Sequence, residues 1–579
     1  MKTKSPLTLT IAAVGLFVVG IHPTIAGTFA STQSGSWNSA ATWGGAGVPG
    51  CADTVTISGG TTVTEDASQC SGDLTVNGTL DMTNDFFFFE GTTFTNNGAL
   101  ISSTPYGEFR FNGVGGAGGT TQNLAGTGTY NTNGRVDFHT LFSTTVVPAS
   151  GAVLNGLTNW TIDGGSVLSL SNNFVVNGLT GSGQTTFFNN STISGSGILK
   201  THNNVTINSG GIITALLEVV SGTTSASGGN SGNFGPITVD SGATLFESGN
   251  VAANGDLTVN GTLDMSNQYF FFGGTTFTNN GALISSAASG FGEFRFNSVG
   301  NNTNGGTTQN LAGTGTYNTN GRVDFHTLFS TTVVSATGAL IEGVFNNTID
   351  GGSTFNNHGT MAPGFPPGTA NVSGNWQLGS TSNLAFGIEG TTPGTQYDVF
   401  NKTDGSALTL NGDLSVRLMN GFVPANSDVF TIVTTQQILA GSFSNVANGG
   451  RINTEDGAGS FRVTYNVLND PIASSKVVLS DFQPINRCDT DPPGIGIAPA
   501  NIEQPIRPQQ KKVNGQKGAY VYFTVIANDL EDGPVPATAN PPSGSFFPLG
   551  TTLVTVTATD HCNNTTTKTF TITVSNKKK

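Results

Sequence analysis

The segment from Thr120 to Val147 reads TTQNLAGTGTYNTNGRVDFHTLFSTTVV, and residues 307–334 repeat it letter for letter. Upstream of each copy, GDLTVNGTLDM begins at Gly72 and again at Gly255. The offset between the copies grows from 183 residues at Gly72 to 187 at Thr120, because two short insertions separate identical blocks. Both insertions fall in segments rich in Gly, Ser and Asn, which are typical of surface loops that tolerate extra residues. The chain therefore contains an internal duplication, and its fold has to be explained as a repeat.

A finer repeat of 20 residues lies inside each copy: Asn77-Gly78-Thr79-Leu80 is followed by Asn97-Gly98-Ala99-Leu100. This step is too short for a helix pair and suits one rung of a parallel β-solenoid, in which strands stack about 4.8 Å apart. We expect Asn and Gly to supply left-handed backbone conformations at the corners, and stacked Asn side chains to form amide ladders there. The sequence predicts an all-β fold with a right-handed parallel β-helix over residues 72–373, in which the duplicated copies span 72–168 and 255–353.

Composition and motifs argue against nucleic-acid binding, metal binding and several classes of catalysis. Only 10% of the 579 residues are charged, and the net charge of −14 leaves no basic stripe of the kind that nucleic acid needs. No GxSxG elbow, P-loop, HExxH or EF-hand loop occurs, and no CxxC or HxxxH spacing indicates zinc. We therefore expect no cofactor, no metal and no catalytic residues.

The first residues have the pattern of a secretory signal. Lys2 and Lys4 precede an apolar run from Leu7 to Ile21, and Thr24-Ile25-Ala26 forms a small-x-small cleavage site. We interpret residues 1–26 as a signal peptide, the alternative being an uncleaved anchor. No later run is long enough to span a membrane, so a secreted or cell-surface protein without a transmembrane segment is expected.

Residues 27–71 are expected to cap the first rung, because an open strand edge would recruit other chains. Trp37 and Trp43 suit such a cap, although they could instead form an exposed sugar-stacking pair. The four cysteines fit an exported protein, and pairing within domains selects Cys51–Cys70 and Cys488–Cys562 from the three connectivities.

Two strand patterns in each copy are candidate binding sites. In Arg135-Val136-Asp137-Phe138-His139, alternation places Arg, Asp and His on one face of a strand and Val and Phe on the other. The polar row could contact a ligand, or Asp137 could orient His139 as a base; the alternative is a solvated strand face. The same row recurs in the second copy as Arg322, Asp324 and His326.

The aromatic runs Phe86 to Phe89 and Tyr269 to Phe272 should turn two rings inward and two outward. Outward rings could stack on sugars or a partner, or could form a covered structural spine.

Three stretches resemble known families. The opening from Ser34 to Thr64, with Trp37, Trp43, Pro49 and Asp53, resembles the start of many bacterial extracellular β-solenoid proteins. Residues 374–483, with YDVF at Tyr397 and FRVTYNV at Phe461, resemble the β-rich module that often ends solenoid passengers of bacterial autotransporter-like and adhesin-like surface proteins. That resemblance implies a terminal β-rich cap, although the strands of an autotransporter barrel do not follow.

The last domain, residues 484–579, resembles the HYR (hyalin repeat) family. The resemblance rests on Asp491-Pro492-Pro493, on PSGSFFPLGTT from Pro542 and on VTVTATD from Val554. It implies an immunoglobulin-like β-sandwich linked to extracellular adhesion. The two usual cysteines are replaced here, by Asn540 and Val556.

Together these observations predict an adhesive or structural protein that binds an extracellular glycan or surface protein without catalysis; its oligomeric state is open. The alternative is a polysaccharide-active β-helix enzyme (a lyase or glycoside hydrolase). The carboxylates are scattered along the sequence, so a cleft that gathers paired carboxylates near a basic residue would favour the enzyme.

Overall fold

The computed structural model describes residues 26–83, 85–104, 106–130, 135–179, 185–228, 234–287, 290–301, 305–317, 323–364, 366–437, 439–465, 475–484, 491–498, 501–506, 512–513, 515–529 and 532–576. The chain forms two compact units, residues 1–251 and 252–579, which we describe separately. The described residues contain no α-helix; the single turns η1 (Val114–Gly116) and η2 (Val299–Asn301) are 3₁₀. The fold is all-β, as predicted.

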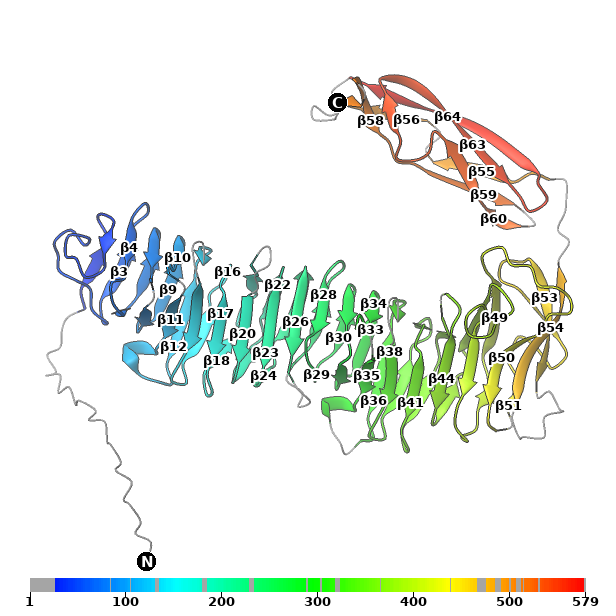
Figure 1. Ribbon diagram of the computed structural model, residues 1–579, viewed down its shortest axis with the longest axis horizontal. Helices are drawn as coiled ribbons and strands as arrows, with labels where there is room; N and C mark the ends of the chain where they lie inside the picture. The colour runs from blue at the N-terminus through cyan, green and yellow to red at the C-terminus, as the bar shows by residue number, and fades with distance from the viewer. Residues whose placement is uncertain are drawn as a thin grey trace, which may run out of the picture. The chain divides into compact units, whose positions relative to one another are not determined.

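The first unit consists of three parallel sheets whose strands stack rung upon rung (Figure 1). The first sheet has the order β1 (Thr28–Ala30), β3 (Thr54–Ile57), β6 (Leu74–Val76), β9 (Thr93–Asn96), β12 (Thr121–Ala125), β15 (Thr145–Pro148), β18 (Val167–Ser169), β21 (Thr192–Ser194), β24 (Ile212–Ile213). The second has β2 (Gly35–Ser36), β4 (Thr62–Thr64), β7 (Thr79–Asp81), β10 (Ala99–Ile101), β13 (Thr129–Tyr130), β16 (Val153–Asn155), β19 (Phe174–Asn177), β22 (Ile198–His202), β25 (Leu216–Ser221), β27 (Ile237–Val239). The third has β5 (Gln69–Ser71), β8 (Phe86–Phe89), β11 (Gly107–Phe111), β14 (Val136–Thr140), β17 (Asn159–Ile162), β20 (Thr185–Asn189), β23 (Val205–Ser209), β26 (Thr223–Ser227), β28 (Thr244–Glu247).

Glycine recurs in each 20-residue repeat because successive rungs lie very close together at this position. A Cβ added at Gly98 would lie 2.0 Å from the carbonyl oxygen of Gly78, and Gly281 is in the same position against Gly261. Only glycine permits that approach. The expected left-handed backbone is therefore wrong at these Asn-Gly corners, where neither residue has a positive φ. The expected amide ladder is present, since Asn97 Nδ2 donates to Asn77 Oδ1 at 3.0 Å.

An aromatic column fills the interior of the first unit. Phe109 stacks on Phe87 with ring centroids 5.3 Å apart and on Phe94 at 4.4 Å. Phe138 packs against Trp160 at 5.3 Å on the following rung. Each such pair contributes about 0.5–1.5 kcal/mol beyond its buried area, so the aromatic rings hold successive rungs in register.

Two buried tryptophan rings and a disulfide lie in residues 27–71, the segment predicted to cap the first rung. Trp37 and Trp43 are buried at 0% and 2% exposure, with ring centroids 5.0 Å apart, which excludes the exposed sugar-stacking pair. The predicted Cys51–Cys70 disulfide is formed. The buried rings and the local cross-link suit a cap, which stays a prediction.

The second unit also contains stacked parallel sheets (Figure 1). One runs β32 (Tyr269–Phe272), β35 (Gly292–Phe296), β38 (Val323–Thr327), β41 (Asn346–Ile349), β44 (Thr369–Ser373), β47 (Val399–Lys402), β50 (Phe430–Thr435), and the antiparallel strands β54 (Lys476–Pro484), β53 (Gly459–Tyr465) and β52 (Arg451–Asn453) end it. Beside it run β30 (Leu257–Val259), β33 (Thr276–Asn279), β36 (Thr308–Ala312), β39 (Thr332–Ser335), β42 (Thr354–Asn357), β45 (Trp376–Leu378). The remaining strands of this part are β31 (Thr262–Asp264), β34 (Ala282–Ile284) and β37 (Thr316–Tyr317), which follow one another in a larger sheet; the four-stranded sheet β40 (Leu340–Glu342), β43 (Thr360–Ala362), β46 (Asn383–Ile388), β49 (Asp413–Leu418); and the pair β48 (Thr409–Leu410), β51 (Ala440–Gly441). Strand β29 (Val251–Ala253) lies at the boundary.

The C-terminal strands form their own core. They are β55 (Gly494–Ala498), β59 (Thr524–Asp529), β60 (Gly533–Val535); β56 (Ile502–Pro505), β64 (Thr565–Ser575), β63 (Gly550–Thr559), β61 (Ala537–Asn540); and β57 (Lys512–Val513), β58 (Gln516–Tyr520), β62 (Phe546–Pro548). Buried side chains of separate sheets, including Phe547, Val556 and Ile572, meet in one apolar cluster.

Candidate functional site

The predicted polar row of the first copy lies on the outward face of β14. Val136 and Phe138 are buried, at 0% and 1% exposure, whereas Asp137 and His139 keep about a quarter of their side chains exposed. The predicted strand register is therefore confirmed. Burying the aromatic side chain stabilises the fold by about 1.5–3 kcal/mol, whereas an unpaired charge in its place would cost several kcal/mol.

His139 has different partners from those the sequence suggested. Its Nδ1 lies 3.0 Å from Glu108 Oε1 on the preceding strand β11, and its Nε2 lies 3.0 Å from Asp163 Oδ2. Asp137 instead pairs with Arg135 at 3.0 Å and accepts a hydrogen bond from Asn159 Nδ2 at 3.0 Å. The hypothesis that Asp137 orients His139 as a base is wrong, because contacts across rungs replace contacts along the strand.

Arg110 joins the polar row to the aromatic run. Its Nε lies 2.6 Å from Glu108 Oε1, so Glu108 bridges Arg110 and His139. The guanidinium of Arg110 also lies 3.8 Å from the ring centroid of Phe86, which remains 40% exposed. As predicted, Phe87 and Phe89 point inward and Phe86 points outward. A cation over an aromatic face is a stabilising contact, and it partly covers the outward ring.

We call these outward groups the polar face. It consists of Phe86, Glu108, Arg110, Arg135, Asp137, His139, Asn159 and Asp163 in the first copy and Tyr269, Glu293, Arg295, Asp324, His326, Asn346 and Asp350 in the second.

The second copy repeats the polar face. Glu293 Oε1 bridges Arg295 Nε at 2.6 Å and His326 Nδ1 at 2.9 Å, and His326 Nε2 lies 2.9 Å from Asp350 Oδ1. Asn346 donates to Asp324 at 3.0 Å, as Asn159 does to Asp137. Arg322, the remaining predicted residue, lies outside the described residues. The same arrangement thus occurs twice, and Glu108, Asp163 and their counterparts are members that strand alternation alone could not identify.

These contacts shift the pKa values of His139 and Glu108 in opposite directions. The hydrogen bond to Glu108, together with Asp163, raises the pKa of His139 above its ordinary value. Partial burial by itself would raise the pKa of Glu108, but hydrogen bonds from His139 and Arg110 outweigh it, so the pKa of this carboxyl lies below its ordinary value. His326 and Glu293 shift in the same directions for the same reasons. These shifts favour the charged His-Glu pair in both copies.

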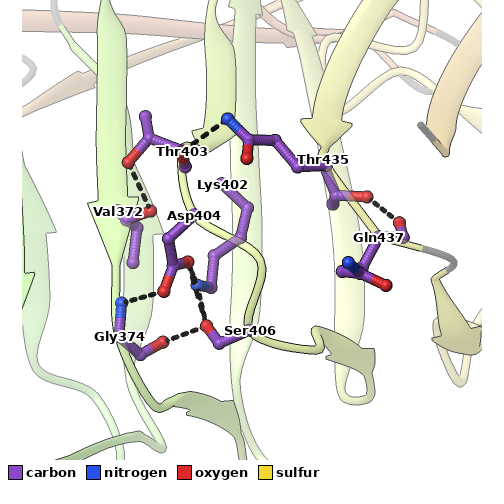
Figure 2. A network of polar contacts seen from close by, with 9 residues as sticks. Val372, Gly374, Lys402, Thr403, Asp404, Ser406, Thr435 and Gln437 are labelled. Carbon is purple, nitrogen blue, oxygen red and sulfur yellow. Dashed lines mark hydrogen bonds and ion pairs between the residues drawn. The ribbon is translucent and has the colours of Figure 1, made fainter. Parts of the chain in front are cut away.

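A second polar cluster surrounds Lys402, whose side chain is fully buried at the end of β47. Figure 2 shows its ammonium reaching Asp404 and Ser406, with which it makes close contacts. Asp404 Oδ2 accepts from the Gly374 amide at 2.9 Å, and Ser406 Oγ donates to the Gly374 carbonyl at 2.7 Å. These side chains satisfy one another and the backbone, so we interpret the cluster as a structural tie between rungs.

A pocket of about 160 Å³ lies on the outward side of the sheet β40-β43-β46-β49. It brings together carboxylates that are far apart in sequence, Glu342, Asp398 and Glu455, with the guanidinium of Arg417. Burial raises the pKa of Asp398 to about 7, with backbone hydrogen bonds acting the other way and Glu342 adding to the rise; burial also raises the pKa of Glu342. The expectation that the carboxylates are scattered is wrong at this place, because rung stacking gathers them.

The described residues contain no group of three or more His, Cys, Asp or Glu side chains that could hold a metal ion. Nor does this part of the chain contain a helix long and apolar enough to cross a membrane. Cys488 and the predicted signal peptide up to residue 25 lie outside the described residues, so the Cys488–Cys562 pairing and the signal remain predictions.

Comparison with known families identifies the C-terminal part. Residues 488–574 match the family of the HYR domain, as the sequence resemblance indicated. This domain is of a cell-surface, adhesion-associated type and is typical of extracellular proteins. No curated protein matches the chain.

Proposed function

We propose that the protein is a secreted or cell-surface structural protein of the bacterial autotransporter-like or adhesin-like kind, which attaches to an extracellular glycan or surface protein through the polar face. The observation that carries the proposal is the repetition of that face with the same contacts in both copies. A duplicated set of outward groups suits repeated binding better than one reaction centre. The HYR domain at residues 488–574 supports an extracellular setting.

The architecture completes the proposal. The stacked parallel sheets suit a right-handed parallel β-helix that serves as a stalk, and the C-terminal strands suit an immunoglobulin-like sandwich. The antiparallel strands β52, β53 and β54 suit a cap that covers the last parallel strand, β50. A signal peptide ending at Ala26 would direct this chain out of the cytoplasm and would then be cleaved.

A glycan array probed with purified residues 27–579 tests the binding function, with an array of extracellular matrix proteins beside it. The proposal predicts binding to a defined subset of ligands, and the binding should weaken when the polar face is altered. The absence of binding on both arrays would refute it.

A polysaccharide-active enzyme is the second candidate, and the pocket at Glu342, Asp398 and Arg417 is the observation that favours it. Most glycoside hydrolases use a pair of carboxyl groups that flank the glycosidic bond, one as acid and one as base or nucleophile. Release of new reducing ends or of unsaturated products from a polysaccharide panel would support this candidate. Polysaccharide-cleaving activity that survives Glu342→Gln would show that the activity does not depend on this pocket.

A further inference from the structure

The pocket on the outward side of β40, β43, β46 and β49 is built by strand register. Glu342 pairs with Ala362, Ala385 pairs with Ser415, and Gly387 pairs with Arg417 on neighbouring strands. Alternate residues such as Leu384, Phe386 and Val416 turn inward and are buried. The outward residues Ala362 and Ala385 therefore form a floor of small side chains, and longer polar side chains stand at its ends.

The walls come from three other segments. Asp398 is held in place by the amides of Gly368 and Gly387, which donate to its two oxygens at 2.7 Å. Met419 covers Gly387 so closely that a Cβ there would lie 2.4 Å from its sulfur. Glu455 comes from the turn between β52 and β53. The pocket is thus an assembled feature of the second unit.

The charged groups at the ends have room for a ligand. Among the described residues, no carboxylate forms an ion pair with Arg417, and no donor makes a hydrogen bond to the Glu342 carboxylate. Glu342 is half-buried, and this burial raises its pKa. A partly buried polar group without a partner costs free energy that a bound partner can recover.

Size and lining together define the class of ligand. An apolar cavity of about 150 Å³ holds one six-membered ring, so a pocket of about 160 Å³ suits a single ring. The lining offers acceptors in its carboxylates and donors in Arg417 and Ser415, and hydroxyl groups can serve both. Three carboxylates disfavour an acidic ring, while burial raises the pKa of Asp398 and of Glu342 and, with the guanidinium, reduces the negative charge that a cationic ring would need.

We propose that this pocket binds one neutral pyranose ring of a glycan, with its C–H face on Ala362 and Ala385 and its hydroxyl groups between Glu342 and Arg417. The site is separate from the polar face and requires no catalysis. It gives the protein a second mode of carbohydrate contact.

Saturation-transfer NMR with methyl β-glucopyranoside, methyl β-galactopyranoside and methyl α-mannopyranoside tests the proposal on purified residues 27–579. At least one of these probes should show transfer with the unaltered protein. Ala385→Val fills the floor and should abolish the signal, whereas Ala282→Val, the same change on the outward side of β34, should leave it unchanged. Arg417→Gln should weaken binding at least fivefold, with folding checked by circular dichroism.

Three results would overturn the proposal: no transfer to any of the three probes, unchanged binding by Ala385→Val, or a signal given by glucosamine or glucuronate but by none of the neutral probes. The double variant Asp137→Asn with Asp324→Asn should keep the pyranoside signal. Loss of the signal in that variant would assign it to the polar face, so failure of this proposal can be told from failure of the proposed adhesive function.

Discussion

Glu65 should make the first unit less stable as the pH rises, and its replacement by Gln should remove that effect. The side chain is buried at 1% exposure in the cap region, and among the described residues no side chain donates a hydrogen bond to its carboxylate; the backbone at Gln69 acts to lower its pKa. Burial raises its pKa from 4.5 to about 9, and the neighbouring carboxylates Asp85, Asp81 and Asp66 add to the rise. The folded protein therefore keeps Glu65 protonated at neutral pH.

The sign and size follow from proton linkage. Because the folded pKa lies above the unfolded one, the stability from Glu65 is complete below pH 4.5 and is lost as the pH rises toward 9. Each pH unit in that interval costs about 1.4 kcal/mol, so the loss is roughly 0.7 kcal/mol at pH 5 and about 3 kcal/mol at pH 7. Gln has the same shape and no titration, so Glu65→Gln should exceed the unaltered protein by about 0.7 kcal/mol at pH 5 and by about 3 kcal/mol at pH 7.

Urea unfolding followed by tryptophan fluorescence measures this difference, because Trp37 and Trp43 pack in the same cap. The matched control is Glu90→Gln: Glu90 is partly exposed and accepts a hydrogen bond from Asn112, which a Gln oxygen can also accept. A stability difference for Glu65→Gln that does not change between pH 5 and pH 7 would refute the linkage argument.

Three further predictions concern single contacts. Asp404→Ala should destabilise the second unit by about 3–5 kcal/mol because it leaves the buried ammonium of Lys402 without its carboxylate. Lys402→Met should cost less, because the Asp404 side chain left behind is 35% exposed. Equal losses of stability in denaturant unfolding would contradict this difference. Cys51→Ser with Cys70→Ser should lower the stability of the first unit by about 2–5 kcal/mol, and an unchanged melting temperature would show that the cross-link does not hold the cap. Glu108→Gln should lower the pKa of His139 in an NMR titration because it removes the carboxylate whose hydrogen bond and charge raise it. His202, whose ring contacts Ser221 and forms no ion pair with a carboxylate of the described residues, serves as the reference signal, and an unshifted His139 would contradict the bridge.

The sequence was sufficient for the strand faces and insufficient for contacts between rungs. Alternation correctly placed Val136 and Phe138 inside and Asp137 and His139 outside, because period two is a local property of a strand. The partners of His139 could not be found in this way: Glu108 and Asp163 lie 31 and 24 residues away and become neighbours only when rungs stack. The pocket at Arg417 was missed for the same reason, since its walls come from strands and loops separated by more than 100 residues.

Glycine at the corners shows a different limit. Its presence was predicted, but for backbone conformation, whereas at Gly98 and Gly281 the reason is the carbonyl oxygen of the rung below. A contact of this kind depends on stacking distance and leaves no separate mark in the sequence.

The most direct test of the central claim is ligand adhesion by the double variant Asp137→Asn with Asp324→Asn. Each substitution keeps the size of the side chain while removing the charge at the centre of one copy of the polar face. Attachment to the ligand found on the arrays should fall at least tenfold, while circular dichroism and the unfolding midpoint stay close to those of the unaltered protein. Unchanged attachment, with stability altered by less than about 0.5 kcal/mol, would show that the duplicated polar face is an ordinary solvated surface.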